Sequence, residues 1–204
     1  MRLFTIGILL LFNPFFASSS PETIALTRGP YLQMARPTSM MVVWNTNVSA
    51  EGTVRYGRYP GPNWEFLQTS PSSTLHAIEL NNLTPDTLYY YEIQSGGTVL
   101  ASGSDYSFTT YPLSGNAKPF RFAAFGDSGN GSQKQAEMVS QMKALRPQPE
   151  LTLGLGDLVY SNGEWENYDP RYFGPNADIL RSQVLWPSMG NHDSYTEKIG
   201  RAHV

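Results

Sequence analysis

The chain has 204 residues, of which 40% are hydrophobic and 15% charged, the composition of a globular protein with one large or two small domains. Its formal net charge is −3 and it contains no run of Lys and Arg, which excludes a basic surface for nucleic acid. It contains no cysteine, which excludes disulfides and a lipid-modified Cys. The fold must therefore depend on its hydrophobic core.

The first residues, MRLFTIGILLLFNPFFASSS, have the pattern of a secretory signal peptide. Arg2 precedes an apolar run over residues 3–12, and small residues follow up to Ser19, where we expect cleavage, so that the signal comprises residues 1–19. A membrane anchor is the alternative, but a run of about ten apolar residues is too short to span a bilayer. We expect a secreted or periplasmic protein with no stable membrane insertion after the signal is removed.

Residues 27–110 contain short β-rich runs separated by turn residues. Strands of this length and spacing predict an all-β sandwich with Trp44 in its core. The expected strands are residues 40–46, 53–56, 75–80, 88–93 and 106–110.

The stretch LTPDTLYYYEI, residues 83–93, resembles the fibronectin type III family. In that family a Tyr at a strand corner bonds back to the backbone, and Tyr89 is the candidate here. Alternation along the strand would bury Tyr89 and Tyr91 and leave Tyr90 exposed, so core packing is favoured over a binding surface.

The pattern changes after residues 111–119, a stretch rich in Pro, Gly and Ser that indicates a linker. Three apolar strands are expected, with helices over residues 132–146 and around 168–182 between them, which predicts a parallel βαβαβ sheet. The first helix would bury Ala136, Val139, Met142 and Leu145 and end at Pro147. The strands are expected over residues 120–125, 151–155 and 184–189.

Each of these three strands ends in a polar motif. The motifs are FGDSG with Asp127, LGDLVY with Asp157 and Tyr160, and MGNHD with Asn191 and His192. Because ligands of open parallel sheets bind beyond the carboxyl ends of the strands, we expect these side chains to converge in one crevice. One such motif alone is often only a turn or a cap, but three in succession favour a functional site.

The convergence of carboxylate and amide oxygens predicts a bound cation. These oxygens would repel one another or stay unsatisfied without a counter-charge, and a hard cation supplies it. Asp157 is the expected bridge between two ions, because a carboxylate has two oxygens. Two neighbouring ions can clamp a phosphoryl group and generate a hydroxide at mild pH.

In this order the motifs resemble the calcineurin-like metallophosphoesterases, whose signature is D-x-H, G-D-x-x-D and G-N-H-D/E, then a lone His and G-H-x-H. Gly129 stands in place of the His of D-x-H, and Tyr160 in place of the second Asp of the next motif. Both departures together are typical of the purple acid phosphatases, many of which carry a fibronectin-like domain in front. The resemblance implies a fibronectin III-like sandwich over residues 27–110, followed by an α/β part, the first βαβαβ portion of a metallophosphoesterase domain, over residues 120–204.

The resemblance also implies an acid phosphatase that hydrolyses small phosphate monoesters at a centre of Fe(III) and a divalent iron, zinc or manganese ion. Asp127 and Tyr160 would hold Fe(III), Asp157 would bridge, and Asn191 would hold the divalent ion. A phenol has a pKa of about 10, so it needs an ion as polarising as Fe(III) to bind as phenolate. His192 would be catalytic, lying beside the phosphate and protonating the leaving alkoxide.

The chain has three His, and the family's lone His and G-H-x-H have no counterpart in it. His76 is expected to be half-buried in the sandwich, and His203 follows too soon after His192. We therefore expect a truncated, N-terminal part of a longer enzyme with little or no activity alone. Asp193 either orients His192 or faces solvent. A binuclear phosphodiesterase or nucleotidase, and a non-catalytic extracellular fibronectin III-like binding protein, remain alternative functions.

Overall fold

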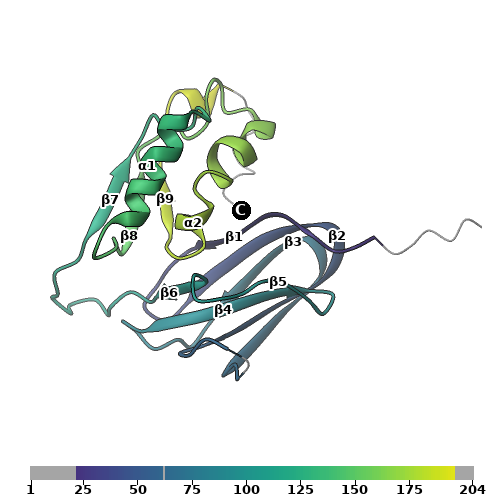
Figure 1. Ribbon diagram of the computed structural model, residues 1–204. Coiled ribbons are helices and arrows are strands. Elements are labelled where there is room, and N and C mark those ends of the chain that lie inside the picture. Colours follow the sequence, from purple (N-terminus) through teal and green to yellow (C-terminus); the bar gives the residue numbers. More distant parts are fainter. Residues whose placement is uncertain (1–21, 62, 196–204) are drawn as a thin grey trace, which may run out of the picture.

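The computed structural model describes residues 22–61 and 63–195, and the expected signal peptide lies outside these ranges. An antiparallel β-sandwich is followed by a smaller unit of three strands and short helices that packs beside β1 (Figure 1). In the part of the chain described, no helix combines the length and the apolar composition needed to cross a membrane.

The sandwich is built from six antiparallel strands around one core. The long strand β2 pairs with β3 along its length, with β1 through its first half and with β4 through its second half. Strand β4 also pairs with β5 and β6. The strands are β1 (Leu26–Gln33), β2 (Met40–Gly57), β3 (Phe66–Leu80), β4 (Leu88–Ser95), β5 (Thr98–Ala101) and β6 (Ser107–Thr109).

The sandwich is confirmed, although its strands differ in part from those expected. Residues 40–46 and 53–56 belong to one strand, β2, and β1 and β5 were not expected. Gly52 does not end β2, because it lies in the pairing with β3, where a Cβ would stand 2.4 Å from the Nδ1 atom of His76. His76 is buried, with 1% of its surface exposed, so its expected half-burial was wrong.

The expected burial of Trp44 in β2 and of Tyr89 and Tyr91 in β4 is confirmed, whereas Tyr90 is less exposed than expected. Trp44 is fully buried, and Tyr89 and Tyr91 are buried, while Tyr90 between them is half-buried. The Tyr89 hydroxyl accepts a hydrogen bond from the backbone N–H of Thr84 at 3.0 Å. The tyrosine corner is therefore present at the expected residue.

The smaller unit contains a three-stranded parallel sheet in the order β7-β8-β9. Residues 111–119 contain no helix or strand. The sheet is parallel, as expected, and each strand is shorter than its apolar run. Its elements are β7 (Phe122–Phe125), α1 (Gln133–Ala144), β8 (Leu151–Gly154) and β9 (Leu185–Pro187).

The buried face of α1 is only partly the expected one. Val139 is buried and Met142 is half-buried, but Ala136 and Leu145 are exposed, and the polar Gln135 is buried in their place. Positions 135, 139 and 142 follow the three-to-four residue spacing of one helix face, whereas steps of three drift around the helix. The prediction of Ala136 and Leu145 as core residues was wrong for this reason.

Between β8 and β9 the chain forms short helical turns in place of the longer helix expected. They are η1 (Trp165–Asn167), η2 (Asp169–Phe173) and α2 (Ala177–Leu180). Pro175 lacks a backbone N–H and follows Gly174, so the helix cannot continue from η2 into α2. The compact turns bring several aromatic side chains of this segment against the sandwich.

Candidate metal centre

The loop that follows β7 carries Asp127 in a left-handed backbone conformation, with φ of 52°. Its backbone N–H donates to the carbonyl of Gly156 in the neighbouring loop at 3.2 Å. Two residues later, Gly129 has no room for a side chain, because a Cβ there would stand 1.6 Å from the carbonyl oxygen of Leu158. The absence of a side chain at residue 129 lets the two loops touch.

The loop that follows β8 repeats this conformation. Asp157 has φ of 51° and is buried, with 7% of its surface exposed. Its predecessor Gly156 has φ of 95°. The backbone N–H of Tyr160 donates to the carbonyl of Gly129 at 2.8 Å, so this loop is fixed against the first one. Left-handed conformations are rare for residues other than glycine and gather at functional sites.

The two loops bring three side-chain oxygens to one point. The Tyr160 hydroxyl lies 2.9 Å from Asp127 Oδ1 and 3.0 Å from Asp157 Oδ2, sharing its hydrogen between the two carboxylates. The three side chains come from two strand ends. Asp157 and Tyr160 follow Asp127 by 30 and 33 residues along the chain. The expected convergence of Asp127, Asp157 and Tyr160 is therefore present.

The third loop, after β9, is tied to the same carboxylate. Asp157 Oδ1 accepts a hydrogen bond from the backbone N–H of His192 at 2.9 Å. A Cβ on Gly190 would lie 2.1 Å from that oxygen, so only glycine allows this approach. Asn191 lies at the same edge of the sheet because the next residue, His192, is bonded to Asp157. The side-chain oxygen of Asn191 is not one of the three oxygens that meet at Tyr160.

The imidazole of His192 lies against the Tyr160 ring, with 4.5 Å between ring centroids. Its Nδ1 lies 2.6 Å from the carbonyl oxygen of Ser161, and because a carbonyl only accepts, Nδ1 carries the hydrogen. This bond fixes the ring and leaves Nε2 for another partner. His192 is thus placed beside the phenol at the rim of the site.

Asp193 has a role that neither expected alternative described. It is buried, and its Oδ1 accepts from the N–H of Val159 at 3.0 Å, while its Oδ2 accepts from Leu158 at 3.1 Å and from Gly190 at 3.0 Å. Asp193 therefore neither orients the imidazole nor faces solvent. It joins the second and third loops, and the only signal for this in the sequence is its place directly after the Asn-His pair.

The three converging oxygens fit a hard cation. Burial, followed by hydrogen bonds from the phenol to the two carboxylates and by their negative charge, raises the pKa of Tyr160 well above its ordinary value. A cation bound by these three oxygens would take the place of the phenol proton. Among the residues that the structure describes, no group of three or more His, Cys, Asp or Glu gathers as a metal site, so the donor set depends on the phenol.

Known proteins resemble this chain in sequence and in fold. The family described as "Purple acid Phosphatase, N-terminal domain" matches residues 27–110. Purple acid phosphatase 23 of Arabidopsis thaliana is 30% identical, in an alignment that covers 87% of this chain and 48% of that protein. Residues 27–110 belong to the family of purple acid phosphatase N-terminal domains, and the chain is similar to purple acid phosphatases over most of its length.

Other purple acid phosphatases align in the same way. The enzyme of Glycine max is 26% identical over 88% of this chain and 35% of its own length. The structure of purple acid phosphatase PPD1 from yellow lupin seeds superposes with a TM-score of 0.65 at 18% identity, covering 81% of this chain and 36% of that one, which shows a similar fold. The chain spans about a third to a half of the length of these relatives.

Proposed function

We propose that this chain contributes the iron-binding part of a metal-dependent acid phosphatase that hydrolyses small phosphate monoesters. Residues 120–204 would be the first part of a calcineurin-like metallophosphoesterase domain, residues 27–110 the N-terminal domain and residues 111–119 the linker between them. The proposed location is secreted or periplasmic, with residues 1–19 as the signal peptide.

One observation carries the proposal. The Tyr160 hydroxyl lies 2.9 Å from an oxygen of Asp127 and 3.0 Å from an oxygen of Asp157, at the carboxyl ends of two parallel strands. Both Asp residues have left-handed backbones, which are rare for residues other than glycine. Within residues 22–61 and 63–195, no Lys or Arg is bonded to these oxygens, and a phenol between two carboxylates suits a strongly polarising cation.

In this proposal Asp127 and Tyr160 would hold Fe(III), Asn191 would hold a divalent iron, zinc or manganese ion, and Asp157 would be shared between the two. When bound, such a pair of ions supplies positive charge against the phosphate and acidifies a water. Tyr160 must give up its proton to serve as a ligand. His192, with its Nδ1 hydrogen held by Ser161, would present Nε2 to the phosphate and pass a proton to the leaving alkoxide.

The described residues supply part of such a centre. Asp157 Oδ1 is already tied to the backbone of His192, and its Oδ2 faces Tyr160. The second ion would have Asp157 and Asn191 as its protein ligands, fewer than the three or four that bind a divalent transition metal tightly. We therefore expect the 204 residues to bind Fe(III) more tightly than the divalent ion, and to hydrolyse p-nitrophenyl phosphate slowly or not at all.

The experiment is a titration of the protein with Fe(III), followed by visible absorption. Phenolate bound to Fe(III) absorbs in the visible, so a coloured complex of one iron per chain is expected, and Tyr160→Phe should remove the colour. Tyr90→Phe, a half-buried tyrosine of the sandwich, is the matched control and should keep it. A colourless wild-type complex, or colour that survives Tyr160→Phe, would contradict the proposal.

A further inference from the structure

A nearly buried arginine of the sandwich, Arg28, forms an ion pair with the smaller unit. Arg28 in β1 donates from Nε to Asp169 Oδ1 at 2.6 Å and from Nη2 to Asp169 Oδ2 at 2.9 Å, and its side chain is 8% exposed. Its guanidinium lies 4.9 Å from the ring centroid of Trp165 and 4.2 Å from that of Phe173. A guanidinium held by two parallel bonds and two rings fixes both the position and the orientation of its partner.

The segment that Arg28 holds, η2, also supports the candidate ligand Tyr160. Arg171 of η2 donates from Nη1 to the backbone carbonyl of Tyr160. Gln135, buried in the first turn of α1, donates from Nε2 to the Arg171 carbonyl at 2.6 Å. Its Oε1 accepts from the N–H of Gly131, in the loop that carries Asp127. Thus η2 touches the supports of both loops that meet at the phenol.

We propose that Arg28 of the β-sandwich is a positioning residue for Tyr160. By fixing η2, it keeps Arg171 where it holds the Tyr160 carbonyl, so that the phenol stays between Asp127 and Asp157. Side chains that orient a metal ligand affect metal affinity without touching the metal. The inference rests on the proposed function, because a misplaced phenol matters chemically only if it binds an ion.

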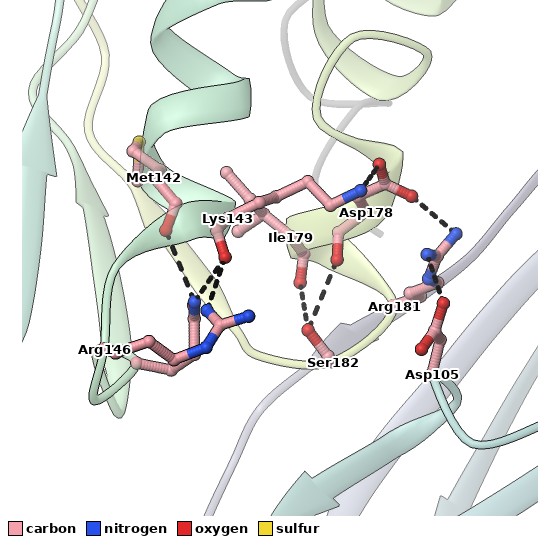
Figure 2. A network of polar contacts seen from close by, with 9 residues as sticks. Asp105, Met142, Lys143, Arg146, Asp178, Ile179, Arg181 and Ser182 are labelled. Atoms are coloured by element: carbon pink, nitrogen blue, oxygen red, sulfur yellow. Dashed lines mark hydrogen bonds and ion pairs between the residues drawn. The ribbon is translucent and has the colours of Figure 1, made fainter.

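A purely structural contact between the two units would be an alternative role for Arg28, and the molecule contains a matched control for it. Arg181 donates from Nη2 to Asp105 of the sandwich at 3.2 Å and from Nη1 to Asp178 at 2.6 Å, and Asp178 also pairs with Lys143 (Figure 2). This second bridge leads to the last turn of α1. That turn lies about 12 Å along the helix from Gln135.

The test uses the NMR signal of the Tyr160 Cζ carbon in metal-free, 13C-tyrosine-labelled protein, assigned by its loss in Tyr160→Phe. The signal depends on the hydrogen bonds of the phenol. Arg28→Gln and Asp169→Asn should each shift it toward the position of a solvent-exposed tyrosine, and Arg28→Lys, which keeps the charge but not the two parallel bonds, should shift it less. Asp105→Asn, which weakens the control bridge, should leave it in place.

An unmoved signal in Arg28→Gln and Asp169→Asn would overturn the inference, and so would an equal shift in Asp105→Asn. If Arg28→Gln does not fold, as judged by far-UV circular dichroism, the milder Asp169→Asn carries the test. In a parallel Fe(III) titration, Arg28→Gln should bind iron roughly tenfold more weakly than wild type. Absence of iron binding by wild type would count against the proposed function alone, since the NMR comparison does not depend on a metal.

Discussion

Gly129 sets how closely the first two loops of the candidate metal centre approach each other. A Cβ at this position would stand 1.6 Å from the carbonyl oxygen of Leu158 and 2.8 Å from the nitrogen of Val159. The Gly129 carbonyl accepts from the backbone of Tyr160. The two departures from the metallophosphoesterase signature are therefore physically linked, because the missing side chain at residue 129 allows the phenol to reach Asp127.

We predict that Gly129→Ala separates the two loops. The added methyl group overlaps backbone atoms, which cannot move aside as a side chain can, so the free energy of unfolding should fall by about 1–3 kcal/mol or more. Gly126→Ala, where the nearest atom to a Cβ is a Leu155 side-chain carbon at 3.2 Å, is the control and should cost less. Urea unfolding of both variants measures the difference, and equal costs would contradict the close approach.

A second prediction concerns the proton of Tyr160. Because burial and the two carboxylates raise the pKa of the phenol, it stays protonated at neutral and acid pH, and Fe(III) must displace this proton. The affinity for Fe(III) should therefore fall as pH falls, with a contribution from Tyr160 of about tenfold per pH unit. Competition with a chelator of known affinity, at several pH values, measures the slope. Tyr160→Phe should lower it by one proton, and an unchanged slope would exclude phenolate binding.

At the scale of single residues, the sequence predicts which residues form the candidate site better than it predicts what they contact. Asp127, Asp157 and Tyr160 could be selected because each follows an apolar strand, and parallel strand ends lie at one edge. Asp193 could not, because its three N–H partners belong to loops whose distance from it depends on the assembled sheet. The same holds for Gly129, whose constraint comes from a residue 29 positions away.

At the scale of elements, β2 and β3 enclose a buried histidine. The His76 ring stacks on Trp44 with 4.7 Å between centroids, and its nitrogens lie 3.2 Å from Ser70 Oγ and 3.5 Å from Ser95 Oγ. Both of these side-chain partners are uncharged hydroxyl groups. Burial lowers the pKa of His76, with a smaller opposing effect of a hydrogen bond to the Ser73 backbone.

We predict that this histidine makes the sandwich less stable in acid. The unfolded chain takes up a proton on His76 near pH 6.5, whereas the folded chain does so only at lower pH. The contribution is thus fully present above pH 6.5 and is lost as pH falls toward the folded pKa, with a slope of at most about 1.4 kcal/mol per pH unit. Urea unfolding at several pH values measures the slope. His76→Gln should reduce the slope of the free energy of unfolding against pH, however stable the variant is. An unchanged slope would contradict the prediction.

The elements themselves were partly predictable. The parallel strands β7, β8 and β9 could be predicted, because short apolar runs alternate with helical segments in the sequence. The continuity of β2 was not predictable, since Gly52 and its polar neighbours have the local pattern of a turn. The close approach of His76 and Ser70 explains the glycine there. The buried face of α1 was misjudged because Gln135 is buried for its hydrogen bonds to Gly131 and Arg171, which local hydrophobicity does not indicate.

At the scale of the whole molecule, the sandwich and the smaller unit share buried side chains. Tyr31 and Val43 of the sandwich belong to one cluster with Phe173 and Leu185, and the rings of Tyr31 and Phe173 lie 4.9 Å apart. Val184 of the smaller unit packs into the core of the sandwich. The composition of residues 111–119 suggested a linker between separate domains. Local composition cannot reveal a shared core, because the residues that pack together are more than 100 positions apart in the sequence.

We predict that the two units unfold together. Phe173→Ala should remove about 3–5 kcal/mol of stability and speed amide hydrogen exchange in β2 as well as in β8. Phe120→Ala is the matched control, because Phe120 is 60% exposed and should cost about 0.5 kcal/mol or less. Mass spectrometry of peptides from both strands follows the exchange. Faster exchange confined to β8 would mean that the units are independent.

The most direct measurement of the central claim is anomalous diffraction at the iron absorption edge from crystals of the protein grown with Fe(III). The account predicts an iron peak bonded to the oxygens of Tyr160, Asp127 and Asp157, and loss of that peak in Tyr160→Phe. An iron peak bound elsewhere, or iron at this place that does not contact the phenol, would contradict it.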